Sequence, residues 1–288
     1  MDIAFAVDET YAEHAQVAME SVLECHPGRD GIVFWLLTTD DVAKTRSGHL
    51  GRQLDGRAEL RLLTCGDEFR SLPVAEPDWL DYLSPGMYLR LLLPELVGDG
   101  PRRLLYLDAD TAACGDLAPL WTVPLDEQLV PLDEQLVPLH EQLVLGAVRD
   151  AYNPTLDAQG GIPGAGPDVD GGAAYFNSGM LLINLAAWRA QDVTGRCLDY
   201  LAANASRLRF PDQDALNLAA SGRWLRLPHR WNHMRSYDLE PGPDAPWPDT
   251  DVRIMHFAGR RKPWTEGFRP GHRLARYRRL AAAVAAYA

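Results

Sequence analysis

Short apolar runs alternate with stretches of helical spacing through the first third of the chain. Residues 3–7, 31–37 and 58–63 are strand-like runs, rich in apolar, β-branched or aromatic side chains. Between them, residues 11–23 carry apolar side chains at helical spacing, and residues 41–54 form a polar, helix-like stretch. Strands that alternate with helices are typical of a parallel sheet with crossover helices. The pattern therefore predicts an α/β fold.

The same pattern continues through the rest of the chain. Residues 104–107 form a buried strand, and residues 145–148 and 180–183 are further strand candidates. Residues 185–203 and 212–220 have the spacing of helices. Glycine and proline gather at residues 160–172, and proline and acidic residues at 238–251. These two stretches cannot hold regular structure, so we expect surface loops there.

An internal repeat occupies residues 123–144, which read VPLDEQL twice, then VPLHEQL and a final V. Its leucines fall in the four-three spacing of a coiled-coil seam, but prolines recur at positions 124, 131 and 138. Because a proline inside a helix costs about 3 kcal/mol, the segment is either a kinked amphipathic helix or a series of short turns. A projecting leucine stripe would expose an apolar patch. We therefore expect homo-oligomerisation through residues 123–144, as paired or bundled helices.

Composition narrows the class of protein. The chain has 288 residues, 47% hydrophobic and 24% charged, which is ordinary for a globular protein and excludes collagen or a disordered chain. The net charge of −12 argues against nucleic acid as a partner, because phosphate binding needs a basic surface. The four cysteines form no CxxC pair, and no signal peptide or membrane-spanning run is evident. Together these features predict a cytoplasmic protein with reduced thiols.

The C-terminal segment, residues 265–288, is predicted to be a basic helix. Arg273, Arg276 and Arg279 recur at helical spacing beside apolar residues. A basic amphipathic helix can lie on an anionic leaflet, so a peripheral contact with the inner face of the membrane stays open. We favour the alternative, in which the helix packs on its own domain and the arginines face water.

Two acidic residues carry the first chemical signal. Asp108 and Asp110 follow directly on the buried strand at 104–107. Ligands of open α/β sheets bind outside the carboxyl ends of the strands, and Mg²⁺-like ions prefer carboxylate oxygens. Since residues i and i+2 of a strand face the same side, both acids can reach one ion. The alternative is a strand end with two solvated acids.

Six blocks, in order along the chain, resemble the retaining glycosyltransferases of family 8, which include glycogenin and the bacterial lipopolysaccharide galactosyltransferases. The blocks are IAFAVD at 3–8, YLRL at 88–91, YLDAD at 106–110, FNSGMLLIN at 176–184, DQDALN at 212–217 and HFAGRRKPW at 256–264. The resemblance covers nearly the whole chain. It implies a GT-A type nucleotide-sugar-binding fold, with a mixed, mostly parallel sheet flanked by helices. Residues 1–288 would form one domain, with 123–144 inserted.

The resemblance also implies an activity and a metal. A hexosyl group, glucose or galactose, would pass from a UDP-sugar to an acceptor hydroxyl with retention of configuration. The implied ligands of Mn²⁺ or Mg²⁺ are Asp108, Asp110 and His256. The residues implied near the reacting carbon and the departing diphosphate are Asp150, Asp212, Gln213 and Lys262. The residues implied in donor binding are Ala6, Val7, Asp8, Thr10, Arg90, Asp108, Ala109, Asn177, Ser178, Gly259 and Lys262.

The residue types suit these roles. Asp8 can accept hydrogen bonds from a uracil or ribose, and Ala6 is small enough for a base to approach the backbone. Arg90 is a fork-shaped donor for a phosphate or sugar hydroxyl, and Lys262 acts on the diphosphate as a point charge. Thr10 departs from the family, in which many members carry asparagine at that position.

The mechanism and the acceptor are less defined. No residue is a well-placed nucleophile, and Gln213 is a poor one, so we expect a same-face displacement in which the diphosphate helps to deprotonate the acceptor. The acceptor is a saccharide, a lipid-linked glycan or a protein. Its pocket is expected to come from the loops at 160–172 and 238–251.

Two other functions fit parts of the sequence. The stretch LLYLDADT at 104–111 also matches the nucleophile motif of haloacid-dehalogenase phosphatases, in which the first aspartate attacks phosphorus. That motif usually opens its domain, whereas here it follows more than a hundred residues. A non-catalytic glycosyltransferase-like module that assembles through the repeat is the other alternative. The intact set of Asp108, Asp110, His256 and Lys262 argues against it.

Overall fold

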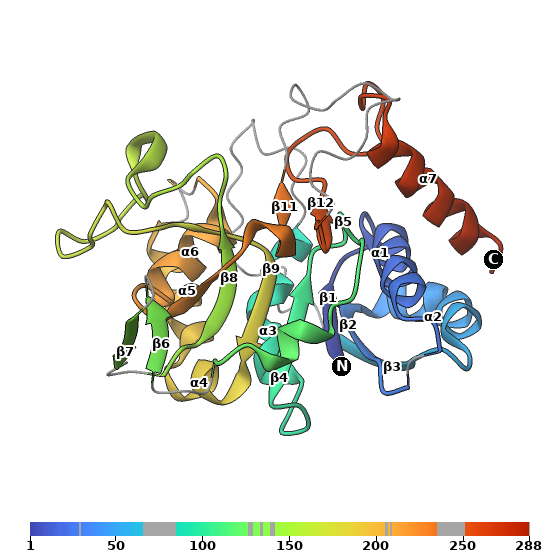
Figure 1. Ribbon diagram of the computed structural model, residues 1–288, viewed down its shortest axis with the longest axis horizontal. Coiled ribbons are helices and arrows are strands. Elements are labelled where there is room, and N and C mark those ends of the chain that lie inside the picture. The colour runs from blue at the N-terminus through green and yellow to red at the C-terminus, as the bar shows by residue number, and fades with distance from the viewer. Residues whose placement is uncertain are drawn as a thin grey trace.

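The computed structural model (Figure 1) describes nine parts of the chain. They are residues 1–28, 30–65, 85–125, 129–132, 135–138, 142–204, 207, 209–234 and 251–287. Within them, helices lie on both faces of a central sheet, and the C-terminal helix packs at one side (Figure 1). The assignment of residues 1–288 to a single domain stays a prediction.

In the described parts of the chain, the central sheet has seven strands and is mixed, mostly parallel, as the sequence predicted. In spatial order the strands are β10 (Trp224–Leu227), β8 (Leu145–Arg149), β9 (Phe176–Asn184), β4 (Arg103–Leu107), β1 (Asp2–Ala6), β2 (Val33–Thr39) and β3 (Glu59–Cys65). Only β9 among them runs antiparallel to its neighbours, β4 and β8. The start of β9 therefore lies at the edge of the sheet where the parallel strands end.

The five inner strands are buried on both faces because the two faces are covered by different helices. Along β4, Leu105 and Leu107 pack into one apolar cluster, while Leu104 and Tyr106 pack into the other. The first cluster includes helices α1 (Ala12–Cys25) and α2 (Asp40–Leu54). The second includes α3 (Leu89–Leu96), α4 (Leu185–Ala190), α5 (Val193–Asn204) and α6 (Pro211–Ala219). Continuous apolar strands with helices on both sides are what a parallel sheet requires.

A small second sheet was not predicted from the sequence, and it lies beside the carboxyl end of β4. Its strands are β11 (His233–Met234), β12 (Ile254–His256) and β5 (Thr111–Ala113). β12 runs antiparallel to β5 and places His256 opposite Thr111. These strands have two or three residues each, too few for a period-two pattern to show in the sequence. The described ranges also contain four short 3₁₀ helices: η3 (Pro85–Tyr88), η4 (Ala118–Thr122), η5 (Ala158–Gly160) and η6 (His229–Trp231).

The predicted helix at 185–203 is two helices in the structure. α4 ends at Ala190 and α5 begins at Val193, because Asp192 between them adopts a positive φ of 48°. The Oδ1 atom of Asp192 accepts a hydrogen bond from the backbone N–H of Gly195, at 3.2 Å. An acid that caps the next helix in this way stops the helix before it. The apolar spacing runs on across the break, so periodicity alone missed it.

The prediction of a helix in the repeat is wrong for the residues that the structure describes. Residues 129–132 and 135–138 form two short strands, β6 and β7, which pair antiparallel. Pro131 lies opposite Leu136, and Pro138 opposite Leu129. A proline every seven residues breaks any helix that the leucines favour, but a two-stranded ribbon has outer edges on which proline is tolerated. Leu125 and Leu143, near the two ends of the repeat, are buried in the main core.

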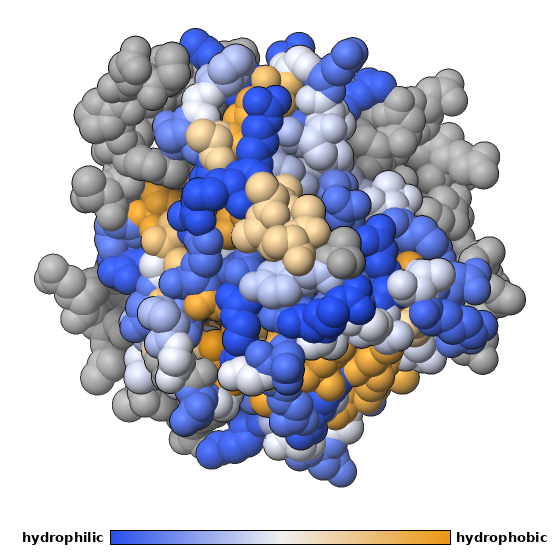
Figure 2. Space-filling view, turned by 90° about the vertical axis from the view of Figure 1, so that its right-hand side faces the viewer, coloured by the Kyte–Doolittle hydropathy of each residue, from blue (hydrophilic) through white to orange (hydrophobic). Residues whose placement is uncertain are grey.

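The basic segment at 265–288 contains helix α7 (His272–Ala285), whose apolar side packs on the fold. Arg273 is buried and donates to the carbonyl of His233, at 3.1 Å, and Arg276 donates to the carbonyl of Ala113. Arg279 pairs with Glu24 of α1. Three arginines expected to face water thus contact the protein. The face of the molecule viewed in Figure 2 is largely hydrophilic, with apolar side chains gathered in smaller areas.

None of the helices in the described ranges is long and apolar enough to span a membrane. Contact of α7 with a leaflet stays a prediction.

Candidate functional site

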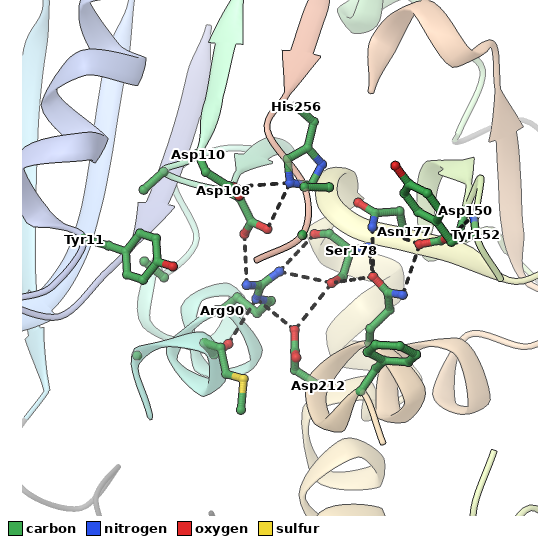
Figure 3. Close-up of a pocket in the computed structure, with 18 of the residues that line it drawn as sticks. Tyr11, Arg90, Asp108, Asp110, Asp150, Tyr152, Asn177, Ser178, Asp212 and His256 are labelled. Atoms are coloured by element: carbon green, nitrogen blue, oxygen red, sulfur yellow. Dashed lines mark hydrogen bonds and ion pairs between the residues drawn. The ribbon is translucent and has the colours of Figure 1, made fainter. Parts of the chain in front are cut away.

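A cavity of about 400 Å³ opens at the edge where the parallel strands end. Ala6 ends β1 and Val7 follows it, Asp108 follows β4, and Asp150 follows β8. Because β9 is antiparallel, its first residues reach the same edge and bring Asn177 and Ser178 to the cavity. Small-molecule sites are commonly clefts of this size, about 300–1,000 Å³. Figure 3 shows the side chains of Asp108, Asp150, Asn177 and Ser178 converging from several elements.

Two carboxylates and an imidazole meet at one end of the cavity. The Nε2 atom of His256 lies 3.2 Å from Oδ1 of Asp110 and 3.9 Å from Oδ2 of Asp108. The acids converge because Asp108 and Asp110 sit in the turn between β4 and β5, where Thr111 N–H donates to the carbonyl of Asp108, at 3.1 Å. The two acids lie close together, and it is the turn that brings them together rather than the alternation of a strand. That they share one ion stays a prediction.

This group fits a divalent cation. Asp108, Asp110 and His256 each offer a ligand atom, and these atoms all lie within 4.8 Å of one another. Carboxylate oxygens suit Mg²⁺ and Mn²⁺, and Mn²⁺ also accepts an imidazole. Within the described chain, this is the only cluster of three acidic, histidine or cysteine side chains so arranged.

Lys262 reaches the same end of the cavity from the loop after β12. Its ammonium pairs with Oδ2 of Asp110 and donates to the carbonyl of Phe257, at 3.1 Å. Burial opposes the charge on Asp110, but Lys262 and His256 outweigh it and hold the pKa of that carboxyl well below its usual range. The loop turns at Gly259, whose φ of +94° is one that other residues rarely adopt. Asp110 is therefore a stable anion that pairs with a lysine.

Arg90, on α3, sits between two of the acids. It pairs with Oδ1 of Asp108 at 2.9 Å and with Oδ2 of Asp212 at 3.1 Å, and donates to the carbonyl of Ser178 at 3.2 Å. Burial disfavours the charge on Arg90, but the two acids raise its pKa above the usual range. Burial raises the pKa of Asp212, and Arg90 only partly offsets that effect. Arg90 therefore positions two acids, and its contact with a phosphate or sugar stays a prediction.

The other end of the cavity holds a network of amides around Asp150. The carboxylate of Asp150 accepts four hydrogen bonds: from the backbone N–H groups of Tyr152 and Asn153, and from the side chains of Asn177 and Gln213. The carbonyl oxygen of Gln213 accepts from Asn177 Nδ2 at 3.1 Å and from the backbone N–H of Ser178 at 3.0 Å. A buried polar network with this many hydrogen bonds is rigid. It presents fixed oxygens and amides to whatever occupies the cavity.

Most of the residues predicted from the sequence line this cavity. Those that do are Ala6, Val7, Arg90, Asp108, Ala109, Asp110, Asp150, Asn177, Ser178, Asp212, Gln213, His256, Gly259 and Lys262. Asp8 and Thr10 are not among the described lining residues. Asp8 instead accepts from the backbone N–H groups of Thr10 and Gly86, at 3.0 and 3.3 Å, and so joins the first strand to η3. Its contact with a base or ribose stays a prediction.

Several lining residues were missed. They are Tyr11, Gly86, Met87, Tyr152, Asn153, Gln159, Phe210 and Ala258. All but Gln159 lie within three positions of a residue or block that was singled out, and Ala258 stands inside the block at 256–264, so closeness to a motif was the available signal. The loop at 160–172 is anchored beside α5, where Tyr200 donates to the carbonyl of Pro163 at 3.0 Å and Ile162 is buried. All but Asp251 of the loop at 238–251 lies outside the described residues.

Aromatic side chains hold the Lys262 loop against α1 and α7. The rings of His14 and Trp264 stack at 3.5 Å, with an angle of 14° between their planes. His14 also bonds to the hydroxyl of Tyr277, at 2.7 Å. Trp264 is two residues from Lys262, so this stack fixes the loop from which the lysine enters the cavity.

The burial of His14 in its stack with Trp264 predicts that the protein becomes less stable as the pH falls. Burial lowers the pKa of His14 to about 4, from 6.5 in the unfolded chain. The unfolded chain therefore takes up the proton first as the pH falls, and stability present above pH 6.5 is lost progressively down to pH 4, by at most about 3 kcal/mol. His14→Phe keeps an aromatic ring on Trp264 but cannot titrate. Thermal unfolding from pH 7 to 4.5 should show a shallower pH dependence for His14→Phe than for the wild type, and equal slopes would contradict the prediction.

Comparison with known proteins gives a consistent result. A model of the glycosyl transferase family 8 matches residues 2–267. The chain is 27% identical over 271 residues to the lipopolysaccharide glucosyltransferase WaaO of Escherichia coli, covering 92% of this chain and 72% of that protein. It is 25% identical over 269 residues to the lipopolysaccharide 1,3-galactosyltransferase of Salmonella typhimurium, covering 91% of this chain and 72% of that protein.

The solved structures agree with the sequence matches. The galactosyltransferase LgtC, crystallised in complex with donor and acceptor sugar analogs, superposes with a TM-score of 0.74 at 26% identity. The superposition covers 98% of this chain and 96% of that chain. Over nearly all of its length, the chain is therefore similar to this solved structure in both sequence and fold.

Proposed function

The chain belongs to glycosyl transferase family 8, and from this premise we propose that it transfers a hexosyl group from a UDP-sugar to an acceptor hydroxyl with retention of configuration. The observation that carries the proposal is the cavity with two unlike ends. Asp108, Asp110 and His256 gather at one end, and the rigid network of Asp150, Asn177 and Gln213 lies at the other. A nucleotide sugar has the same two parts, a diphosphate that needs cations and a ring of hydroxyls that needs fixed polar partners.

At the diphosphate end, Asp108, Asp110 and His256 would hold Mn²⁺ or Mg²⁺. When bound, the cation would supply positive charge to the oxygen that leaves as the glycosidic bond breaks. Lys262 adds a second positive charge from its buried position beside Asp110. Its pairing with Asp110 holds the ammonium in place before the donor arrives, so it need not reorganise as charge develops.

At the sugar end, Gln213 acts as a positioning group rather than as a nucleophile. Its carbonyl oxygen already accepts from Asn177, from the backbone N–H of Ser178 and from the Ser178 hydroxyl, at 3.0–3.3 Å. An oxygen with these three donors has little electron density left to attack carbon. This supports a same-face displacement, in which the acceptor oxygen bonds to the sugar carbon as the diphosphate leaves and takes the acceptor proton.

The acceptor is proposed to be a saccharide that enters past Tyr152. This side chain is 46% exposed, and its residue lies two positions after Asp150 at the cavity. An exposed aromatic ring at the cavity offers an apolar face to a sugar ring, while Asp150 and Asn153 offer hydrogen-bonding groups. Lipid-linked glycans and glycosylated proteins carry the same chemistry, so both remain within the proposal.

A panel of nucleotide sugars tests the function. We expect UDP release from UDP-glucose or UDP-galactose in the presence of Mn²⁺, faster with a saccharide acceptor and abolished by EDTA. Phosphate release from simple phosphomonoesters without a nucleotide sugar would support the haloacid-dehalogenase alternative instead. A failure to bind UDP with Mn²⁺ in calorimetry would support the non-catalytic module.

We also propose that residues 123–144 mediate homo-oligomerisation, now through strands rather than helices. A two-stranded sheet is marginally stable on its own in water, so the hairpin of β6 and β7 would gain from a partner such as the same hairpin of a second chain. Leu125 and Leu143 anchor the base of the repeat in the core.

Deleting residues 124–137 tests the oligomer and removes two whole repeat units. Leu139 then takes the place of Leu125 in the chain, so the anchor is kept. Light scattering should report a smaller species, and transferase activity should persist because the deletion lies outside the residues that line the cavity. An unchanged mass would contradict an oligomer through this segment.

A peripheral membrane contact would have to use the polar side of α7, because the helix buries its apolar side against α1, β5 and β12. Sedimentation with anionic vesicles at low salt decides it. Protein that stays wholly in the supernatant would remove the membrane from the proposed partners.

A further inference from the structure

Three side-chain hydrogen bonds in a row join Asp150 to Asn177, Asn177 to Asn232, and Asn232 to His256. The Nδ1 atom of His256 lies 2.8 Å from Oδ1 of Asn232, and Nδ2 of Asn232 lies 2.9 Å from Oδ1 of Asn177. Asn232 is 1% exposed and sits between η6 and β11, outside every motif that the sequence analysis used. We propose that Asn232 is a positioning residue, which fixes the Nδ1 proton of His256 and so makes Nε2, the ring nitrogen that faces Asp108 and Asp110, the one that binds a cation.

The orientation of the Asn177 side-chain amide fixes the direction of the hydrogen bonds that lead from it to His256. The carbonyl oxygen of Asn177 accepts from the backbone N–H of Gly179, at 3.0 Å, and its amide nitrogen donates to the carboxylate of Asp150, also at 3.0 Å. Because a backbone N–H only donates and an ionised carboxylate only accepts, the orientation of the Asn177 amide is settled twice over.

The Asn177 amide in turn fixes the orientation of Asn232 and the position of a proton on His256. Asn232 must present its amide nitrogen to the carbonyl oxygen of Asn177, so its own carbonyl oxygen faces His256. A carbonyl oxygen only accepts, and the Nδ1 atom of His256 therefore carries a proton. A cation held here would therefore bind His256 through Nε2, the ring nitrogen that lies 3.2 Å from Oδ1 of Asp110.

The consequence for the site is chemical. An imidazole binds a metal through a nitrogen that carries no proton, and the hydrogen bond at the other nitrogen decides which one that is. The inference rests on the proposed function, since it takes the three side chains to hold a cation. It adds that the orientation of His256 is set by Asn177, which also contacts the Asp150 and Gln213 network. The side-chain amide of Asn177 therefore links the proposed cation site to the network at the sugar end of the cavity.

The first readout needs no metal and no activity. Protein labelled with ¹⁵N at its histidines should show a slowly exchanging proton on Nδ1 of His256, identified by its absence from His256→Gln. This proton should be lost in Asn232→Leu, which is apolar and similar in size. It should be retained in Asn232→Asp, whose carboxylate still accepts from Nδ1 but no longer donates to Asn177.

The second readout is the Mn²⁺ dissociation constant, measured by electron paramagnetic resonance of free Mn²⁺. Loss of a group that orients a metal-binding histidine typically weakens affinity about 10–100-fold. We expect this for Asn232→Leu, while Asn232→Asp stays near the wild type. Asn204→Leu is the matched control, because Asn204 is buried and hydrogen-bonded at the end of α5, away from the cavity, and should leave the Mn²⁺ affinity unchanged.

The outcomes separate this inference from the proposed function. A retained Nδ1 proton in Asn232→Leu would overturn the positioning role, and so would its loss without any change in Mn²⁺ affinity. If the wild type binds no Mn²⁺, the proposed function fails, and the ring proton alone decides whether Asn232 orients His256. Should Asn232→Leu fail to fold, Asn232→Asp still decides: loss of its Nδ1 proton would contradict the proposal.

Discussion

Replacing Asp110 with asparagine should lower kcat by roughly 10²- to 10³-fold, the usual cost of removing one charge-stabilising group from an active site. Two effects combine here. The substitution removes one of the three clustered ligand atoms, and it leaves the buried ammonium of Lys262 without its acidic partner. Asparagine has almost the same shape, so a loss of activity would report charge rather than packing.

The controls for Asp110→Asn separate chemistry from stability. Asp199→Asn makes the same chemical change on the exposed side of α5, and should leave kcat and the unfolding temperature unchanged. Transfer rates should be measured with saturating Mn²⁺ and again in EDTA. Turnover of Asp110→Asn at nearly the wild-type rate in the presence of EDTA would mean that no cation takes part.

Gly179→Ala should disable the same cluster by steric means. A Cβ atom on Gly179 would lie 2.3 Å from Cε1 of His256 and 2.9 Å from Oδ2 of Asp108, far inside contact distance. Both side chains are packed in place, so the methyl group must displace at least one of them, at a cost of about 1–3 kcal/mol. We expect Mn²⁺ affinity to fall at least about tenfold, as when a metal ligand loses its orientation, with the unfolding temperature lowered as well.

Gly51→Ala is the matched control for Gly179→Ala. Gly51 lies inside α2, and a Cβ atom there would meet nothing within 4 Å. Alanine is favoured over glycine in a helix by about 0.5–1 kcal/mol, so this variant should unfold at a slightly higher temperature and bind Mn²⁺ normally. Wild-type affinity in Gly179→Ala would show that His256 and Asp108 can move apart without loss, and the cluster would not be the cation site.

The parts of the site that the sequence could predict are those where the chemistry is contiguous. Asp108 and Asp110 stand two residues apart after an apolar run, and Asp212 and Gln213 are adjacent, so each pair is visible in one short stretch. The sheet could be predicted for a similar reason, because buried parallel strands are continuous apolar runs.

The contacts that could not be predicted join residues far apart in the chain. Arg90 pairs with Asp212 across more than a hundred positions, and Asn232 reaches Asn177 across 55. Such pairings depend on the order of strands in the sheet and on the direction of β9, which no local pattern records. The prediction of a helix in the repeat was wrong for the opposite reason. Its leucines gave a strong local signal for a helix, and the proline in every unit overrode it.

The anchoring of the repeat at both ends has a consequence for how this gene changes over time. Each unit spans seven codons, and the units are nearly identical in amino-acid sequence. Where the codons repeat as the residues do, a replicating polymerase can slip and gain or lose whole copies. Because Leu125 and Leu143 hold the two ends in the core, a copy added or lost between them alters only the length of the hairpin and keeps the reading frame. Closely related strains should therefore carry alleles with different numbers of units around an unchanged catalytic domain. Sequencing this locus across isolates would reveal a length polymorphism that selection on catalysis does not oppose.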